Sequence, residues 1–327
     1  MIKNRNIAAD AGIEPSKVMM GGGALGPREI FYVAKSGTAE YAYLQARVPE
    51  THFFGTINGA MARAGDSSTV LVYPGQYKET ATINVTQSNF KLLAAEIGPN
   101  KAMIRTEIRQ HGGYEVPCVT CNVHGFEMAG FRVTPYSSNV GTGIVLASTA
   151  NTYGAYIHDN YFYQVEVGAA MANAITMGGG AISEGSYAYD ADSTYISNNH
   201  FYAGGSATSV GSSVDIGIIE WRAATRTVIE KNTFFQYTNW ADNYAINIYD
   251  AAGYRGQILD NKFFAAEIGV ELSAAVAINN PVAVGGDVMI DGDTFVNYAS
   301  ADTMITSRTA ECLGVNYANA TIIAVAG

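Results

Sequence analysis

A short pattern of one aliphatic residue, one asparagine and one phenylalanine recurs along the chain. In YISNNHFYAG, residues 195–204, Asn199 follows Ile196 by three positions and Phe201 follows it by five. The same frame also begins at Ile157, Ile229, Ile258 and, in a weaker form, Ile290. Its asparagine positions are Asn160, Asn199, Asn232 and Asn261. Its aromatic positions are Phe131, Phe162, Phe201, Phe234, Phe263 and Phe295, with Phe131 taken from the related stretch HGFEMAGFRV. Successive aromatic positions lie 31, 39, 33, 29 and 32 residues apart, so one unit is repeated along the chain.

A repeat of this length limits the folds that the chain can adopt. A unit of about 30 residues with two or three short strands cannot bury its own apolar face, so the units must stack on one another. The segments between repeats are short β-prone runs broken by Gly, Asn, Asp and Ser, without a sustained helical period. The sequence therefore predicts an all-β solenoid, with successive coils about 4.8 Å apart.

The spacing within the repeat predicts a bend between its aliphatic and aromatic residues. Offsets of zero and five have opposite strand parity, so both side chains point inward only if the chain turns between them. We expect the asparagine at offset three to make this bend, because asparagine tolerates left-handed backbone. Stacked asparagines would then form a structural ladder and stacked phenylalanines an interior column. A sugar-binding strip is the alternative interpretation of the asparagines.

Three segments are expected from the order of these patterns. Residues 1–37 have little apolar periodicity and read as an extended N-terminal arm. Residues 38–300 form the β-helix body, and residues 301–327 a C-terminal strand or cap segment. Within the body, apolar residues share one face of a helix near residues 56–64, which we expect to cap the first coil.

Composition excludes several classes of protein. Hydrophobic residues make up 48% of the chain, but no run reaches the roughly 18 apolar residues of a membrane span. The net charge is -10 without a Lys/Arg cluster, which argues against nucleic acid as a partner. Three cysteines are too few for a disulfide framework, so reduced thiols are expected. The opening lacks an apolar signal-peptide region, and neither a cofactor nor a metal is predicted.

The stretch INGAMARAGDSSTVLVYPGQYKE, followed by the repeats, resembles the pectin-lyase-like superfamily. Its members are single-stranded right-handed parallel β-helices, in which an N-terminal helix caps the first coil and a strand of the form G-D-T-I-x-V-x-P-G-x-Y follows. The resemblance covers about residues 52–300 and implies this fold. It leaves the function open, because the superfamily includes lyases, hydrolases, surface proteins and viral spikes.

The opening NRNIAADAGIEPSKVMMGGGALGPREIFYVAKSG is similar to the starts of tailed-phage particle proteins. This likeness implies a virion protein, made in the host cytoplasm, whose arm binds other capsid or tail proteins. The expected anchors are Ile2, Ile7, Ile13, Val18, Met19 and Met20. The apolar composition after residue 140 and the likeness to viral spikes favour a homotrimer.

Two short motifs are weighed against a purely structural role. Cys118, Cys121 and His124, with His111 nearby, have an incomplete zinc-site spacing. Residues 118 and 121 would face opposite sides of a strand, and buried thiols are common. The stretch RQHGG, residues 109–113, is similar to the His-Gly element of polygalacturonase-like hydrolases, but the clustered aspartates and later basic motif of those enzymes are missing. Structural roles are preferred for both.

Acidic and aromatic residues supply the remaining candidates for a site. Glycosidase chemistry needs two carboxyl groups about 5 to 10 Å apart, which adjacent coils would provide. The candidate acids are Asp190, Asp192, Asp215, Glu220, Asp242 and Asp250. Trp221 and Trp240 are candidates for glycan contact. Recognition is expected in the longest loops, within residues 171–193 and 202–217.

These observations leave two main interpretations. The first is a virion spike, fibre or capsid-decoration protein that binds a host-surface glycan. The second is a polysaccharide-degrading lyase or hydrolase, free or as a tailspike. A surface adhesin is a third, disfavoured by the absence of a signal peptide. The absence of a complete acid/base constellation in the sequence disfavours the enzyme, so the first is preferred.

Overall fold

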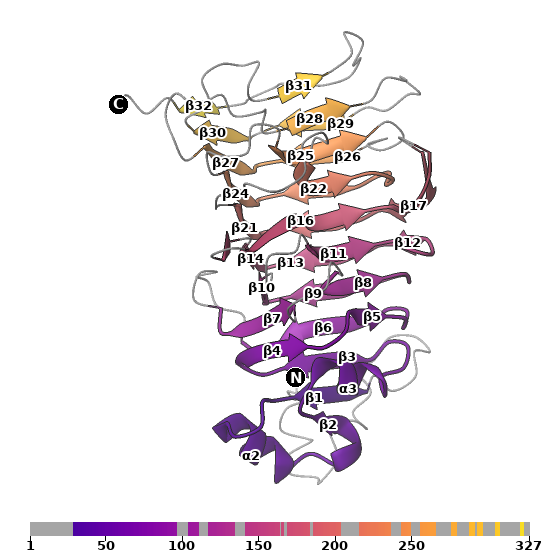
Figure 1. Ribbon diagram of the computed structural model, residues 1–327, viewed down its shortest axis with the longest axis vertical. Helices are drawn as coiled ribbons and strands as arrows, with labels where there is room; N and C mark the ends of the chain where they lie inside the picture. The colour runs from indigo at the N-terminus through magenta and orange to yellow at the C-terminus, as the bar shows by residue number, and fades with distance from the viewer. Residues whose placement is uncertain are drawn as a thin grey trace, which may run out of the picture.

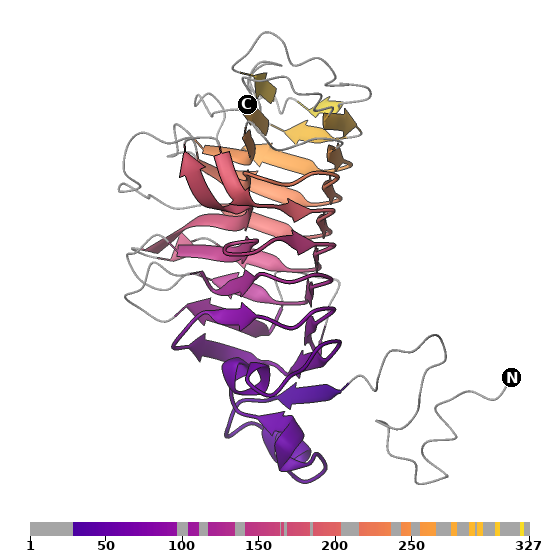
Figure 2. The same ribbon diagram turned by 90° about the vertical axis from the view of Figure 1, so that its right-hand side faces the viewer.

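Each coil of the chain contributes one short strand to each of three parallel sheets, which we call sheets A, B and C. Figure 1 shows the strands of successive coils stacked along one long axis, and Figure 2 shows the same stack from the side. The fold is the right-handed parallel β-helix that the sequence predicts. The structure is a computed structural model that describes residues 29–96, 104–110, 117–134, 141–163, 165–166, 169–183, 186–203, 216–236, 243–249, 256–265, 276–279, 288–291, 293–296, 305–307 and 321–323.

The three sheets take their strands in turn along the chain. Sheet A is ordered β2 (Phe53–Phe54), β1 (Ile30–Val33), β3 (Thr69–Val72), β6 (Lys91–Ala94), β9 (Glu127–Ala129), β13 (Tyr156–His158), β20 (Tyr195–Ser197), β23 (Val228–Glu230), β26 (Gly256–Leu259) and β29 (Val288–Asp291). Sheet B contains β4 (Gly75–Glu79), β7 (Thr106–Gln110), β10 (Arg132–Thr134), β14 (Tyr161–Tyr163), β21 (His200–Ala203), β24 (Thr233–Gln236), β27 (Lys262–Ala265), β30 (Thr294–Val296) and β32 (Thr321–Ile323). Sheet C contains β5 (Ile83–Val85), β8 (Val119–Cys121), β11 (Gly141–Leu146), β16 (Ala169–Met177), β22 (Ile216–Trp221), β25 (Asn243–Tyr249), β28 (Val276–Asn279) and β31 (Ile305–Ser307).

Three smaller pairings lie outside this regular path. Strand β15 (Val165–Glu166) pairs antiparallel with β16, and β17 (Gly179–Ser183) with β18 (Ser186–Tyr189). Strands β12 (Thr152–Tyr153) and β19 (Ala191–Asp192) pair in parallel in the turns that lead from sheet C to sheet A. These turns carry two of the acids singled out in the sequence, Asp190 and Asp192.

The corner between sheets A and B is formed by the residue at offset two of the repeat. Asp159, Asn198, Lys231 and Asp260 occupy this position with φ between 53° and 57°, in the left-handed region. The asparagine that follows is absent from the positive-φ residues, so the expectation that it makes the bend is wrong. The bend turns the chain by using one outward polar residue, which frees the asparagine side chain to point inward.

The asparagines form a buried ladder that links one coil to the next. The backbone N and the Nδ2 of Asn160 both donate to Oδ1 of Asn199, at 3.0 and 3.1 Å. The same pair of hydrogen bonds joins Asn199 to Asn232, Asn232 to Asn261 and Asn261 to Asp293. All five side chains are buried, so they are not available as a sugar-binding strip.

An interior column of phenylalanines runs beside this ladder. Phe162, Phe201, Phe234 and Phe263 lie in register on sheet B, are fully buried, and stack with ring centroids 4.7 to 5.0 Å apart. Phe295 continues the register, although its side chain lies outside the described part.

Phe131 is not a member of this column, contrary to the expectation. Val133 is the residue in register with Phe162. Phe131 instead occupies the asparagine position, where its backbone N donates to Oδ1 of Asn160 at 3.0 Å. The left-handed residue of this coil, Gly130, lies just before Phe131. The repeat in HGFEMAGFRV therefore starts at Met128, in register with Ile157, and not at Phe126.

The N-terminal end of the solenoid is covered by a short helix, α3 (Ile57–Met61), which packs against β1, β3 and β5. Its buried face includes Ile57, Ala60 and Met61. The carboxylate of Glu79 accepts hydrogen bonds from the first backbone N–H groups of the helix, at 2.8 and 3.2 Å. Negative charge at a helix N-terminus is favourable, so Glu79 fixes the cap to sheet B.

The body begins earlier than the predicted boundary at residue 37. Ile30–Val33 forms β1, which extends sheet A beyond β3 because its inward residues Phe31 and Val33 are buried. The helix α2 (Ala39–Gln45) and the 3-10 helix η2 (Glu50–His52) follow at the same end (Figure 1). The six predicted anchor residues lie outside the described residues. No helix in the part of the chain that the structure describes is long and apolar enough to cross a membrane.

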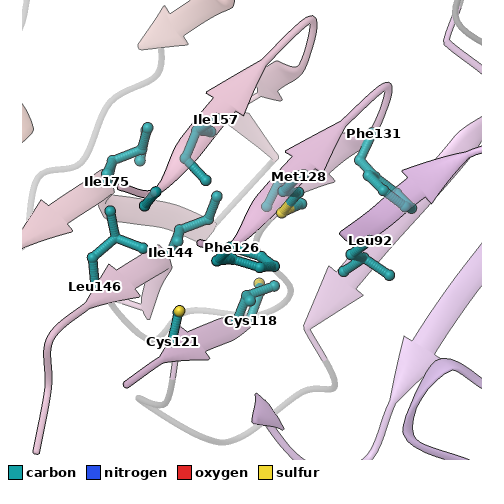
Figure 3. Close-up of a cluster of buried hydrophobic side chains, with 14 of the residues drawn as sticks. Leu92, Cys118, Cys121, Phe126, Met128, Phe131, Ile144, Leu146, Ile157 and Ile175 are labelled. Atoms are coloured by element: carbon teal, nitrogen blue, oxygen red, sulfur yellow. The ribbon is translucent and has the colours of Figure 1, made fainter. Parts of the chain in front are cut away.

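Cys118 and Cys121 both point into the apolar interior (Figure 3). The expectation that they face opposite sides is wrong, because Cys118 precedes β8 at a corner and only the residues after it alternate. Burial raises the pKa of the Cys121 thiol to about 11, so the thiol stays protonated. These cysteines therefore act as small apolar residues.

Replacing Asn199 with alanine should lower the free energy of unfolding by about 3 kcal/mol, because the substitution leaves Asn160 N and Ile157 O without their buried partners. Urea denaturation measures the change. The matched control is Asn198→Gly, at the exposed left-handed position, which should cost less than about 1 kcal/mol. Equal losses in the two variants would contradict the role of the ladder.

Candidate functional site

The outer face of sheet B carries a strip of aromatic side chains that are half-buried, apart from buried Tyr161. In the repeat, the residues before and after each column phenylalanine point outward because strand residues alternate between faces. The strip comprises Tyr161, Tyr163, His200, Tyr202, Phe235 and Phe264. It runs along the axis from β14 to β27, on one side of four successive coils.

The rings of this strip stack on one another. The centroids of Tyr163 and Tyr202 lie 5.4 Å apart with nearly parallel planes, and Phe235 and Phe264 are stacked at 4.8 Å. His200 stacks on Phe235 at 5.0 Å. Because the ring faces are used within the stack, the strip presents ring edges and polar groups outward.

Arg132 lies at the N-terminal end of the strip. Its guanidinium carbon is 4.7 Å from the ring centroid of Tyr163 and 5.8 Å from that of Tyr161. Its Nε is buried without a hydrogen-bond partner, and no ion pair joins it to a carboxylate in the described ranges. The tyrosines therefore hold a cation whose donors are not used by the protein.

Burial sets the protonation states in this cluster. It lowers the pKa of His200, which favours the neutral imidazole at neutral pH. Neither ring nitrogen of His200 has a hydrogen-bond partner among the residues that the structure describes. Burial raises the pKa of Tyr161 more than the nearby Arg132 lowers it, so this phenol stays protonated.

The outer face of sheet B is basic, although the protein carries a net charge of -10. The charged residues at its outward positions, within the described strands, are Lys78, Arg109, Arg132, Lys262 and Glu107. Four cations and one acid thus share this face. Cations outnumber acids on the described part of this face, and such a balance favours an anionic ligand.

Of the acids singled out in the sequence, only Asp190 and Asp192 have described side chains, and Asp192 is engaged by its own turn. Oδ1 of Asp192 accepts hydrogen bonds from N and Oγ1 of Thr225, at 2.7 and 2.9 Å, and Oδ2 pairs with Arg226 at 3.4 Å. Asp192 therefore fastens one coil to the next. Burial, with the charge of Asp192, raises the pKa of exposed Asp190. Within the described side chains, this leaves Asp190 as the one candidate acid without an engaged carboxylate, whereas the glycosidase mechanism needs two.

The other acids give no support to an active site. Glu220 lies in β22, in register with Thr176 and Asn247, and its side chain falls outside the described part. Asp215, Asp242 and Asp250 also lie outside it.

Trp221 is fully buried and donates from Nε1 to the carbonyl of Ala224 at 2.8 Å. The expectation that it contacts a glycan is wrong, because its register with Met177 and Ile248 places it on the inward side of sheet C. Trp240 lies outside the described residues.

The incomplete zinc-site spacing in the sequence is not brought together by the described residues. Cys121 points inward, whereas His124 is exposed and packs against Tyr153 at 4.8 Å. His111 lies outside the described residues. Among the described residues, no group of three or more His, Cys, Asp or Glu side chains fits a metal ion.

The outer face of sheet A carries a second polar cluster, but its charges neutralise one another. Glu127 pairs with Lys91 and lies 3.3 Å from Nε2 of His158, whose Nδ1 is 2.8 Å from Asp159. Burial alone would raise the pKa of Glu127, but Lys91 and His158 lower it below its usual value. This cluster is satisfied internally, unlike Arg132.

Sequence reasoning missed the Arg132 cluster, although a signal was present. The stretches YFY at 161–163 and HFY at 200–202 place three rings in a row. Alternation allows only the middle ring to point inward, so the flanking rings must lie on the surface. The repeat is defined by its inward phenylalanines, so the outward rings beside them form no part of the pattern.

Replacing His200 with glutamine should make stability less dependent on pH. The folded chain has the lower pKa, so below the reference value of 6.5 the unfolded chain takes up the proton more readily. This lowers the free energy of unfolding of the native protein as the pH falls, and the variant loses that component. Urea denaturation at about pH 8 and about pH 5 measures it. An equal pH dependence in both proteins would contradict the burial of His200.

Several solved structures share this fold at low sequence identity. An alginate lyase from Paenibacillus sp. str. FPU-7 is 14% identical, with a TM-score of 0.51, over 81% of this chain and 94% of that one. A pectin methylesterase from Aspergillus niger is 14% identical, with a TM-score of 0.53, over 92% and 87%. Escherichia coli YbhC is 11% identical, with a TM-score of 0.58, over 99% and 94%. No family model and no curated protein matches the sequence. The chain thus has the fold of the pectin-lyase-like proteins, which includes β-helical carbohydrate-active enzymes.

Proposed function

We propose that the protein binds an acidic polysaccharide on the outer face of sheet B. The observation that carries this proposal is Arg132, a cation held between two tyrosines without a carboxylate partner on a basic face. A guanidinium presents its N–H donors in a fork that matches a carboxylate, so a uronate group is a fitting ligand.

The shape of the strip favours a polymer over a single sugar. A glycan that lies along the axis meets outward side chains of the same kind once per coil, about every 4.8 Å. The hydroxyl group of Tyr163 offers a hydrogen bond, and ring edges offer apolar contact. Lys262 adds a cation at the far end, two coils beyond His200 in β21 and three beyond Tyr161 in β14. Binding therefore spreads over several weak contacts.

The similar structures support a carbohydrate ligand but leave its setting open. Their names include an alginate lyase and a pectin methylesterase, which makes a glycan the natural class of ligand for this surface. A virion spike that binds a host-surface glycan would use the same face. None of the named structures is described as a virion protein, so the virion location, the homotrimer and the anchoring arm stay predictions from the sequence.

A second candidate function is cleavage of the bound glycan by β-elimination. It is favoured by the neutral, unpartnered His200, whose ring lies 5.0 Å from the ring of Tyr161. In this reaction a base removes the C5 proton of a uronate, the C4–O4 bond breaks, and a C4=C5 double bond forms. His200 would accept the proton, Tyr161 would protonate the leaving oxygen, and Arg132 would neutralise the carboxylate. Both groups then exchange protons with water, which restores the starting state.

Arg132→Ala should weaken binding of polygalacturonate by about tenfold, because the substitution removes a charge-assisted hydrogen bond. Isothermal titration calorimetry at low and high salt measures the affinity, with neutral dextran as the comparison polymer. The matched control is Arg47→Ala, since Arg47 also stacks on a tyrosine, at 4.0 Å from Tyr43, but lies in the N-terminal region. Equal binding by wild type and Arg132→Ala would overturn the proposal.

His200→Gln and Tyr161→Phe should each slow cleavage by about 100-fold, because each removes a proton-transfer group. The unsaturated product absorbs in the ultraviolet, so the rate is followed directly on polygalacturonate and alginate. His124→Gln, an exposed histidine on another turn, is the control. Binding without any absorbance change in the wild type would leave the protein as a glycan-binding module and remove the second candidate.

A further inference from the structure

The sheet B register brings an acid next to Arg132, yet the two do not pair. Glu107 in β7 and Arg132 in β10 are direct partners on adjacent strands. Both occupy outward positions, where opposite charges on neighbouring strands usually attract and pair. No ion pair between them is found, and neither has another interaction beyond those named here.

The carboxylate of Glu107 is held by two other side chains. Oε2 accepts a hydrogen bond from Nε2 of Gln76 at 3.0 Å. Oε1 accepts a short hydrogen bond from Oγ1 of Thr134. Thr134 is fully buried, so its hydroxyl is a fixed donor. Gln76 lies in β4, and Thr134 lies in β10 two residues beyond Arg132, so both carboxylate oxygens are engaged by side chains other than Arg132.

Arg132 is held from the opposite side. Its guanidinium lies against Tyr161 and Tyr163 of β14, the next coil toward the C-terminus. Gln76 lies in β4, one coil toward the N-terminus from Glu107. Gln76 and the two tyrosines therefore draw the acid and the base apart along the axis. Thr134 holds the carboxylate at a point two residues along β10 from Arg132.

We infer that Thr134 and Gln76 are positioning residues that keep Glu107 from occupying the guanidinium fork of Arg132. A Glu107–Arg132 pair would use the donors that a uronate carboxylate needs, so a free glycan would have to compete with an acid on the neighbouring strand. Diverting Glu107 keeps the site open while the acid remains in the sheet. This inference rests on the proposed function, since it concerns the same arginine.

The experiment removes the restraint without changing the size of the side chain. Thr134→Val deletes the hydroxyl and should release Glu107 to pair with Arg132, which weakens polygalacturonate binding about threefold to fivefold. Adding Glu107→Gln to Thr134→Val should restore binding to at least the wild-type level. Thr227→Val changes a fully buried threonine before β23 of sheet A, whose Oγ1 has no hydrogen-bond partner among the described residues; it is the matched control and should bind as wild type does.

A second measurement does not depend on the glycan. A double-mutant cycle on stability between positions 107 and 132 should give a coupling near zero in the wild type. The same cycle in the Thr134→Val background should show an attractive coupling. If Thr134→Val changes neither the coupling nor the binding, the inference is overturned while the function of Arg132 stands. If the coupling appears but Arg132→Ala binds polygalacturonate normally, the restraint is real and the proposed function fails.

Discussion

Hydrogen bonding between coils at the buried corner of sheets A and B governs the rest of this structure. A corner interrupts the strand ladder, so its backbone N–H groups would be buried without partners, which is costly. Each ladder asparagine supplies the missing acceptor through Oδ1 to the backbone of the preceding coil. Asn carries both a donor and an acceptor on one side chain, so identical residues can repeat this bond indefinitely. The stacking of the repeats is therefore stabilised by the asparagines as well as by the apolar residues.

A fixed corner determines what reaches the surface. Once the asparagine sets the frame, parity dictates that the residues on either side of each column phenylalanine point outward. The same register that stacks Phe162 on Phe201 inside stacks Tyr163 on Tyr202 outside. The aromatic strip and the position of Arg132 thus follow from the core. No separate loop is needed to build this surface, which makes it rigid compared with the turns.

The sequence was sufficient for the fold and insufficient for the site, for reasons that can be traced to single residues. The solenoid prediction rests on several repeats, so the wrong assignment of one of them, at Phe131, did not change it. A site depends on individual residues and gains nothing from averaging. Trp221 looked available for a glycan because tryptophan often lies at interfaces, but its strand parity buries it.

Asp192 shows why acids are hard to assign from sequence in this fold. It has the residue type and the exposure of a catalytic group, yet its carboxylate is used to join two turns. Its partner Thr225 is 33 residues away, a distance set by the length of one coil. Such partners become visible only once the coil lengths are known. An acid in a solenoid turn can therefore be considered catalytic only after hydrogen bonds to the next coil have been ruled out.

The distribution of charge gives the strip its significance. The chain has a net charge of -10, yet the described strands of sheet B carry four outward cations and one outward acid. That acid is Glu107, and its two oxygens are engaged by neutral donors. A structural ion pair with Arg132 would have been easy to form, because the register already places the two side by side. Arg132 instead stays unpaired and is supported by aromatic rings. Leaving a half-buried cation without a partner costs free energy, and an anion bound from outside the protein would offset that cost. The absence of a Glu107–Arg132 ion pair is therefore as relevant to the proposed function as the contacts that Arg132 makes with the tyrosines.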